Sequence, residues 1–220
     1  MEQGLLNECT TPTPRGSQWL ETHSNHRCLC KRTTCRVVLL GDSTISNLSK
    51  SEMWPKFEKL NCLNLGIGGD KIENVLYRIK NGALDEGNFQ IVVLLAGTNN
   101  NGVDAGVMFQ GILECVNCIH EAVPDVDVIL PTLLPRGKYD NAKRRILKQV
   151  SELIRKLRDE EFAMLKVMKP ERVHVVEIDK DVVRNGRISQ NLMYDFVHLT
   201  DAGYFLCFSP ILDKIVELLS

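Results

Sequence analysis

VVLLGDS, at residues 37–43, joins an unbroken apolar run to a glycine, an aspartate and a serine. A short continuous apolar run of this kind is typical of a strand buried on both faces of a parallel sheet. Glycine at its carboxyl end permits a tight turn into the next element. The stretch therefore predicts the first strand of an α/β domain, with a polar loop at the end of that strand.

The chain beyond this stretch alternates short β-branched runs with longer amphipathic segments. The expected strands are residues 36–40, 62–65, 91–96, 126–130 and 173–178. The expected helices lie near residues 46–60, 70–80, 104–122, 140–168 and 201–219. Because this alternation is typical of parallel strands joined by crossover helices, we expect a single three-layer α/β domain over residues 17–220. It should hold a five-stranded parallel sheet with helices on both faces.

Local signals set several boundaries. Residues 1–16 are polar, contain Pro12 and Pro14 and lack periodicity, so they are expected to form a flexible arm. Asp104 is expected to cap the helix that follows it, and Pro124 to end that helix. Asp201 is expected to cap the last helix in the same way.

Composition excludes several classes of protein. The chain is 44% hydrophobic and 25% charged, as core-forming globular proteins are. A formal net charge of -1 gives no excess positive potential for a polyanion, so nucleic-acid binding is not expected. The longest apolar run, residues 91–96, falls far short of the roughly 20 residues that cross a bilayer. Residues 1–20 contain no apolar core of a secretory signal. We therefore expect a cytoplasmic protein without a transmembrane segment.

The chain has eight cysteines, which we interpret as free thiols of a reducing compartment. One cluster imitates a zinc site: it comprises His23, His26, Cys28, Cys30 and Cys35. Its CxC spacing is weaker support for zinc than paired CxxC knuckles, although a zinc site there stays open as an alternative.

Three loops with glycine follow expected strands. They are GDS at 41–43, GIGGD at 66–70 and GTNN at 97–100. Loops that leave the carboxyl ends of parallel strands converge on one edge of the sheet. We therefore look for a site where these three loops meet.

The segment DFVH near the end of the chain adds an acid and a base to these loops. Asp195, three residues before His198, can hold the Nδ1 hydrogen of the imidazole and leave Nε2 free as a base. Ser43 supplies a hydroxyl nucleophile. The backbone amides of Ser43 and Gly69 and the side-chain amide of Asn99 can donate to a developing oxyanion. Together these residues form a complete set for acyl transfer.

Each of these residues also fits an ordinary structural role. Serine after Gly-Asp suits a helix N-cap, GTNN suits an Asx-turn, and a lone histidine such as His198 suits capping or packing. The GIGGD loop also suits a phosphate cradle, but neither GxGxxG nor GxxxxGK occurs. An FMN or nucleotide binder is disfavoured, because Asp42 in the first loop would repel a phosphate.

Four blocks resemble the signature blocks of the SGNH (GDSL-type) hydrolases, in the right order. They are VVLLGDS at 37–43, NLGIGGD at 64–70, GTNN at 97–100 and DFVHLT at 195–200. More narrowly, four parts of the chain are similar to the catalytic α subunits of the intracellular type Ib platelet-activating factor acetylhydrolase. They are Trp54, residues 63–82, LLPRG at 133–137 and residues 194–200. The resemblance covers residues 17–220.

This resemblance implies a flavodoxin-like sheet and a site without metal or organic cofactor. It implies that Ser43 is the nucleophile, His198 the base and Asp195 its partner. Ser43, Gly69 and Asn99 would form the oxyanion hole.

The same resemblance implies a serine esterase for short acyl esters, with the sn-2 acetyl group of platelet-activating-factor-like phospholipids as the expected target. Other SGNH activities remain alternatives: carboxylesterase, lysophospholipase or carbohydrate deacetylase. The resemblance also implies homo- or heterodimers of α-type subunits and a WD-repeat regulatory partner, the lissencephaly protein. A dimeric scaffold that binds this partner is the alternative from outside the enzymes.

Two departures from the family pattern affect these expectations. Thr44 stands where the GDSL group has leucine, which makes the wall near the acyl group more polar and leaves acyl selectivity open. Residues 157–172 look longer than the corresponding connection of the α subunits, which weakens the carry-over of the dimer.

Overall fold

The computed structural model describes residues 8–85 and 87–220. Its main sheet contains β1 (Val37–Gly41), β2 (Cys62–Gly66), β3 (Ile91–Leu95), β4 (Asp127–Pro131) and β5 (Val173–Val176). All pairs are parallel, in the order β2-β1-β3-β4-β5. This is the flavodoxin-like doubly wound order, and it confirms the predicted five-stranded parallel sheet.

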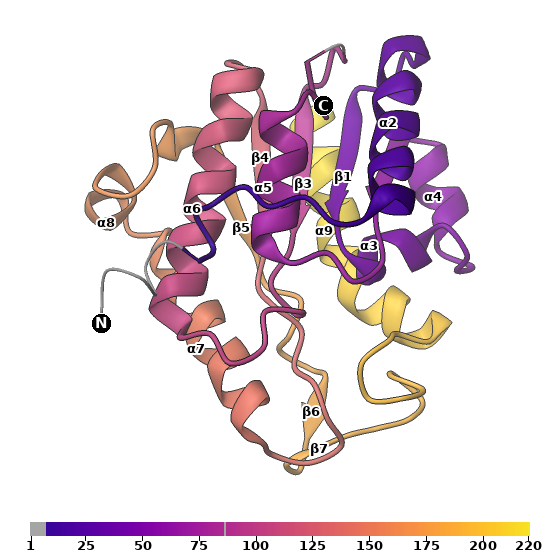
Figure 1. Cartoon of the computed structure of the whole chain (residues 1–220). Coiled ribbons are helices and arrows are strands. Elements are labelled where there is room, and N and C mark those ends of the chain that lie inside the picture. Colours follow the sequence, from indigo (N-terminus) through magenta and orange to yellow (C-terminus); the bar gives the residue numbers. More distant parts are fainter. Residues whose placement is uncertain (1–7, 86) are drawn as a thin grey trace.

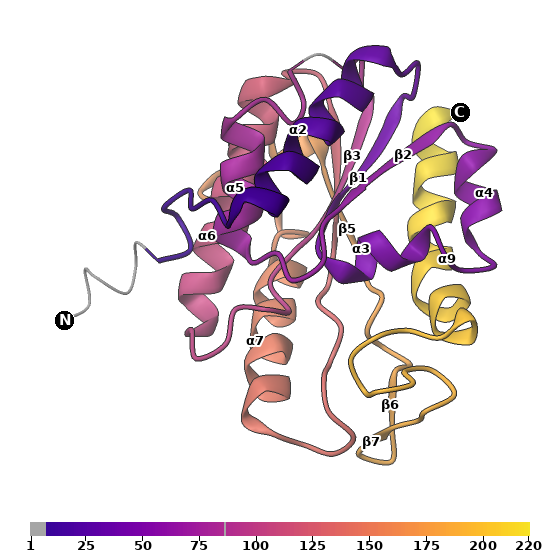
Figure 2. The same cartoon turned by 45° about the vertical axis from the view of Figure 1, so that its right-hand side comes forward.

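Helices cover both faces of the sheet, so the domain has three layers (Figures 1 and 2). They are α2 (Ser17–Arg32), α3 (Ser43–Leu48), α4 (Trp54–Glu58), α5 (Ile72–Lys80), α6 (Ala105–Ala122), α7 (Ala142–Lys156), α8 (Glu160–Met164) and α9 (Asp201–Leu219). Figure 2 shows α2, α5 and α6 on one side of the strands and α4 and α9 on the other. Within the described part of the chain, no helix has the length and apolar character to span a bilayer.

The strand β1 lies between β2 and β3 and is buried along its whole length, as its continuous apolar run predicts. Its last residue, Gly41, pairs with Gly66 of β2 and with Leu95 of β3. A side chain on Gly41 would meet the carbonyl oxygen of Leu95 at 2.2 Å, so only glycine fits there. The three strands therefore end level with one another, and the loops that follow them start side by side.

The helix caps agree with the sequence in one case and differ in another. Asp104 accepts a hydrogen bond from the Gly106 amide at 2.7 Å and caps α6, as predicted. The expectation for Asp201 was wrong, because Thr200 caps α9 by accepting from the Gly203 amide at 3.1 Å. Asp201 instead accepts from the backbone amide of Glu52 at 2.9 Å.

Two predicted helices are each divided in two. The segment expected over 46–60 forms α3 and α4, and that over 140–168 forms α7 and α8. The second division has a local cause, because Asp159 accepts from the Phe162 amide at 2.9 Å and starts α8 anew. Beyond it lie η1 (Pro170–Arg172) and a hairpin of β6 (Val183–Arg184) and β7 (Arg187–Ile188) that was not predicted.

Residues 8–16 belong to the packed domain, which differs from the flexible arm expected over 1–16. Cys9 is fully buried in the core. The Thr13 amide donates to the Glu73 carbonyl at 3.0 Å, and the Thr13 carbonyl accepts from the Asn74 side chain at 2.9 Å. This segment therefore lies against the start of α5, and the rest of the expected arm, residues 1–7, lies outside the described residues.

Candidate active site

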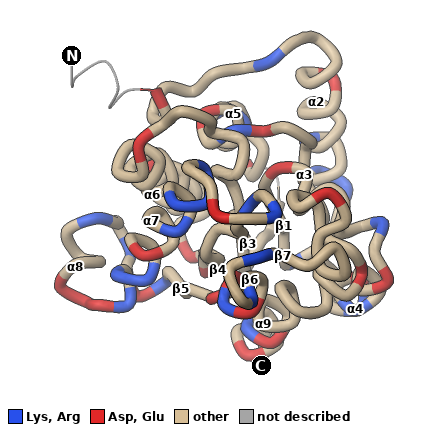
Figure 3. The backbone as a smooth tube through the Cα atoms, turned by 90° about the horizontal axis from the view of Figure 1, so that it is seen from below, with Lys and Arg blue, Asp and Glu red and all other residues tan. Residues whose placement is uncertain are grey.

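The loops after β1, β2 and β3 meet at the carboxyl edge of the sheet. In this strand order the next strands are added on opposite sides of β1, so the strand order reverses between β1 and β3, where ligands bind in doubly wound sheets. The Ile67 amide donates to the Gly41 carbonyl at 3.0 Å, and the Asn99 side chain donates to the Asp70 carbonyl at 2.9 Å. These bonds confirm that the three predicted loops come together. Figure 3 views this edge from below and shows Lys and Arg segments interspersed with Asp and Glu segments.

Ser43 is the first residue of α3 and is half-buried. The cap of this helix is Asp42, whose carboxylate accepts from the Thr44 amide at 2.8 Å. The alternative in which Ser43 serves as the cap is therefore wrong. Asp42 is almost fully buried, and this desolvation raises its pKa to about 6.

Asp195 and His198 form a direct pair. Oδ2 of Asp195 lies 2.6 Å from Nδ1 of His198, while Oδ1 accepts from the backbone amides of Val197 at 3.0 Å and of His198 at 2.7 Å. Desolvation acts to raise the pKa of Asp195, but these hydrogen bonds from His198 and Val197 outweigh it and lower that pKa. An ionised carboxylate on Nδ1 favours the tautomer in which Nε2 carries no hydrogen.

A tight turn holds this pair in place. Phe196 has a φ of 62°, in the left-handed region, and its carbonyl accepts from the Gly137 amide at 2.8 Å. The Tyr194 ring stacks on the His198 ring with centroids 5.8 Å apart. Neither contact had a signal in the sequence beyond the position of these residues beside Asp195.

The helix that follows the turn, α9, contacts the start of α3. The Tyr204 hydroxyl donates to the Thr44 carbonyl at 2.9 Å, which joins α9 to α3. Between them lies an open hollow of about 310 Å³. Its lining residues are Asn47, Lys50, Ser51, Tyr194, Leu199, Thr200, Asp201 and Tyr204. Within the described residues the structure records no hydrogen bond between the Ser43 hydroxyl and the His198 imidazole.

The Gly69 turn and Asn99 lie next to each other. Gly69 has a φ of 79°, which a residue with a side chain rarely adopts, and it is exposed. The Asn99 amide donates one hydrogen to Asp70, which follows Gly69 in the chain. A side-chain amide has two hydrogens, so the second remains for another acceptor.

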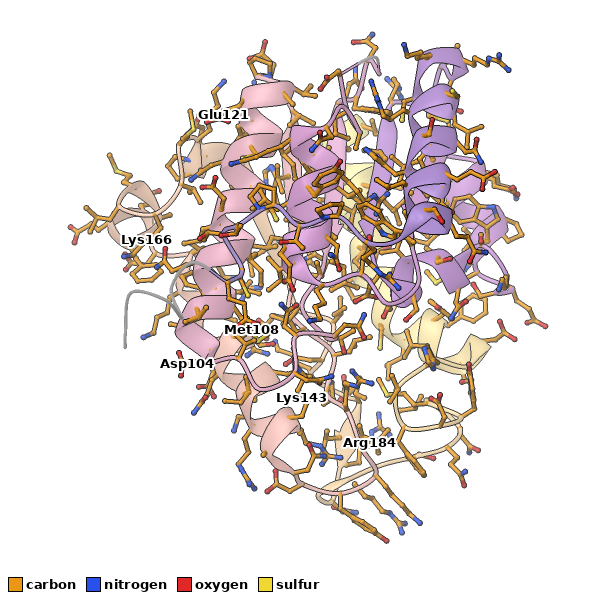
Figure 4. The ribbon with its side chains drawn as sticks, viewed as in Figure 1. Asp104, Met108, Glu121, Lys143, Lys166 and Arg184 are labelled. Atoms are coloured by element: carbon orange, nitrogen blue, oxygen red, sulfur yellow. The ribbon has the colours of Figure 1, made fainter. Side chains whose placement is uncertain are left out.

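Two cations hold the GTNN loop from its other side. Arg136 donates to the Thr98 carbonyl at 2.6 Å, and the Lys143 ammonium donates to the Asn100 carbonyl. Burial, helped by the charge of Arg136, lowers the pKa of Lys143 to about 8. Figure 4 labels Lys143 in the lower half of the molecule, between Met108 and Arg184. The LLPRG block marked Arg136, but no sequence signal marked Lys143.

A small cavity lies beside Ser43. Its volume is about 10 Å³, roughly the space that one water molecule needs. Its lining residues are Asp42, Thr44, Leu95, Ala96, Thr98, Leu133 and Leu134. Both chain neighbours of Ser43 line this cavity, and Ser43 itself does not.

The cysteine and histidine cluster of α2 does not assemble into a metal site. Cys28 is exposed, whereas Cys30 is buried and contacts the Ala83 carbonyl at 3.3 Å. His23 is buried against the rings of Trp19 and Tyr77. Across residues 8–85 and 87–220, no three His, Cys, Asp or Glu residues gather so that they could hold a metal ion.

Comparisons with known proteins show which family profile, relatives and fold the chain matches. The profile of the GDSL-like lipase/acylhydrolase family matches residues 39–206. The platelet-activating factor acetylhydrolase IB subunit beta homolog of Drosophila melanogaster is 35% identical over 222 residues, which cover 98% of this chain and 95% of that protein. The human subunit alpha1 is 34% identical and covers 91% of this chain and 86% of its own. A solved GDSL-like lipase of Bacteroides thetaiotaomicron shares the fold at a TM-score of 0.65 and 19% identity, covering 90% of this chain and 97% of that one.

Proposed function

As a member of the GDSL-like lipase/acylhydrolase family this chain is a carboxylic ester hydrolase, and we propose that Ser43 is its nucleophile, His198 its general base and Asp195 the orienting carboxylate. The observation that carries this proposal is the 2.6 Å contact between Asp195 and His198, on the sheet edge where Ser43 starts α3. The contact leaves Nε2 of His198 as the free acceptor. Nucleophile–base hydrogen bonds are often long in free enzymes and tighten with substrate.

The reaction then takes two steps. The Ser43 oxygen attacks the ester carbonyl carbon while Nε2 of His198 takes its proton. The tetrahedral oxyanion accepts hydrogen bonds from the backbone amides of Ser43 and Gly69 and from the Asn99 side chain. The leaving alkoxide takes the proton from the imidazolium, and water releases the acyl group from Ser43 with the same base.

We propose short acyl esters as substrates, with the sn-2 acetyl group of platelet-activating-factor-like phospholipids as the preferred target. The cavity lined by Asp42 and Thr44 has a volume of only about 10 Å³ and leaves no space for a long acyl chain. The names of the relatives support an acetyl ester of this kind. Thr44 lines the same cavity and makes one wall polar.

Other members of the family use the same set of residues on longer acyl chains or on acetylated sugars, so the set alone does not choose among them. Carboxylesterase, lysophospholipase and carbohydrate deacetylase activity are therefore the alternatives. The length of the accepted acyl chain separates the first two from an acetylesterase. A panel of acetylated sugars separates the third.

The test is hydrolysis of p-nitrophenyl esters from acetate to octanoate by the wild-type protein, Ser43→Ala and Asn99→Ala. We expect turnover to fall steeply beyond acetate. Ser43→Ala should remove nearly all turnover, and Asn99→Ala should lower kcat by roughly 10²- to 10³-fold. Circular dichroism establishes that each variant is folded. Wild-type turnover by folded Ser43→Ala would contradict the proposal.

The proposal extends to assembly and compartment. The relatives are named as subunits, which supports association of this chain with a second copy or a similar α-type subunit. The resemblance to those subunits extends the same expectation to a WD-repeat partner. The eight free cysteines support a reducing compartment, the cytoplasm. Light scattering of the purified protein tests the dimer, and a monomer at micromolar concentration would contradict it.

A further inference from the structure

The carboxylate of Asp70, next to Gly69, is fully buried and accepts hydrogen bonds from three side chains. Arg78 donates to Oδ2 at 3.0 Å, and Trp19 and Arg15 donate to Oδ1 at 2.6 and 3.3 Å. A buried charge is tolerated when it is paired and hydrogen-bonded in this way. The position of Asp70 is therefore fixed from several directions.

The three donors come from separate parts of the chain. Arg78 lies on α5 and also donates to the Leu65 carbonyl at the end of β2. Trp19 lies on α2, and Arg15 lies in the segment before α2. Figure 1 shows this segment crossing α5 on its way to α2. Arg78 and Trp19 belong to the helical layer, whereas Arg15 approaches from the outside and its side chain is 40% exposed.

Arg15 contacts both neighbours of Gly69. Its Nη1 donates to the Gly68 carbonyl at 2.8 Å as well as to Asp70. The guanidinium also covers Gly69, since a Cβ placed on that residue would lie 3.3 Å from Nη1 and Nη2. One side chain therefore holds an exposed turn in its left-handed conformation.

The same turn orients Asn99. The Asp70 carbonyl accepts from the Asn99 side chain at 2.9 Å, so a shift of Asp70 also turns the Asn99 amide. The positions of the Gly69 backbone amide and of the Asn99 side-chain amide therefore both depend on the turn that Arg15 holds. Oxyanion donors act only at a short, defined distance from the developing charge, so a small displacement weakens both.

We propose that Arg15 is a positioning residue of the oxyanion hole, which it keeps in shape by bridging Gly68 and Asp70. This inference rests on the proposed function, in which Gly69 and Asn99 stabilise the oxyanion. It assigns a catalytic purpose to the segment before α2. If Arg15 served only to attach that segment, its loss would change stability and leave turnover per folded molecule unchanged.

The experiment measures kcat, KM and Tm for Arg15→Ala and Arg15→Lys with p-nitrophenyl acetate. We expect Arg15→Ala to lower kcat by about tenfold with KM within about twofold, because the lost interaction acts in the transition state. Arg15→Lys should recover part of kcat, since an ammonium can still donate to Gly68 and face Asp70. The matched control is Arg27→Ala, which removes an α2 arginine that lies against Gly82 at the far end of α5 and should leave kcat unchanged.

A double-mutant cycle separates positioning from general stability. In the Asn99→Ala background we expect Arg15→Ala to lower kcat by a clearly smaller factor than in the wild type. One of the two oxyanion donors that Arg15 positions, the Asn99 amide, is already absent there. Equal costs in both backgrounds, or unchanged kcat in Arg15→Ala beside a normal Asn99→Ala defect, would overturn this inference alone. Wild-type kcat in Asn99→Ala would overturn the oxyanion hole itself and this inference with it. If Arg15→Ala fails to fold, Arg15→Lys replaces it in the same cycle. The inference is then overturned if Arg15→Lys lowers kcat by the same factor in the wild type and in Asn99→Ala.

Discussion

Asp42 and Asp195 are two carboxylates at one edge of the sheet whose surroundings shift their pKa values in opposite directions. Burial raises the pKa of Asp42 to about 6. For Asp195, desolvation is outweighed by hydrogen bonds from His198 and Val197, which lower the pKa. Such divergence assigns separate roles to neighbouring acids. In the proposed mechanism the ionised Asp195 supports an imidazolium, whereas Asp42 caps the helix of Ser43.

Asp42 makes the stability of the protein depend on pH. Its pKa is raised in the folded state, so the folded protein binds more protons than the unfolded chain between about pH 4 and 6. The free energy of unfolding therefore falls as the pH rises through this range. We expect Asp42→Asn to lose this fall and to be more stable at about pH 7.5, by up to about 3 kcal/mol for a rise from 3.8 to about 6.

Urea unfolding between pH 4 and 8 measures this effect. Asparagine keeps an oxygen that accepts from the Thr44 amide, so the cap itself survives. Asp104→Asn is the matched control, because Asp104 caps α6 in the same manner but is exposed. If the free energy of unfolding changed with pH equally in the wild type and in Asp42→Asn, the raised pKa of Asp42 would be contradicted.

Asp195→Asn tests the orienting carboxylate. The substitution removes the charge beside Nδ1 of His198 and favours the wrong tautomer, so we expect kcat to fall by roughly 10²-fold or more with little change in KM. Asp213→Asn, an exposed residue of α9, is the control. Unchanged kcat in Asp195→Asn would remove Asp195 from the site.

At the scale of elements, the start of α9 links stability to the site. Thr200 caps this helix two residues after His198, and its hydroxyl also donates to the Asn191 carbonyl at 2.5 Å. The threonine therefore fixes both the helix and the returning turn. The sequence favoured Asp201 as the cap. Its carboxylate instead accepts a hydrogen bond from the Glu52 backbone amide and so joins α9 to the segment before α4.

Thr200→Ala should lower the free energy of unfolding by about 1 kcal/mol, the usual cost of a lost N-cap. Thr200→Ser keeps the hydroxyl and should stay within a few tenths of a kcal/mol of the wild type. Denaturant titration of the two variants and of Asp201→Ala measures the difference. A neutral Thr200→Ala beside a costly Asp201→Ala would show that the cap lies at Asp201 after all.

At the scale of the whole molecule, the sheet was predictable because its central strands are buried on both faces. β1 and β3 read as uninterrupted apolar runs, and both are fully buried. The helix α2 was missed because few of its residues face the core, namely Trp19, His23 and Cys30. The hairpin of β6 and β7 was missed because strands of two residues are too short to show alternation.

The candidate site was predictable to the extent that it lies in loops after strands. Topology alone brings Ser43, Gly69 and Asn99 to one edge, and spacing alone brings Asp195 to His198. The contact of Arg15 with Asp70 was not predictable. It joins residues 55 positions apart, and it depends on the path of a segment without periodicity.

The charge of the molecule predicts how its activity responds to salt. The net charge is -1, and Figure 3 shows basic and acidic segments interspersed around the site edge. No strong long-range field then steers a charged substrate, so kcat/KM for an anionic short-chain ester should change less than about twofold between roughly 50 and 300 mM salt. Initial rates across that range measure it. A tenfold fall in kcat/KM would contradict this prediction and indicate strong electrostatic attraction of the substrate to the site.

Covalent trapping distinguishes Ser43 from the other nucleophilic side chains as the residue that carries the acyl group. Diethyl p-nitrophenyl phosphate phosphorylates an activated serine and releases p-nitrophenolate, so intact-protein mass spectrometry should show one added diethylphosphoryl group. Peptide mapping should place that group on Ser43, and Ser43→Ala should stay unmodified. A diethylphosphoryl group on any other residue, or equal labelling of folded Ser43→Ala, would contradict the assignment of Ser43 as the nucleophile.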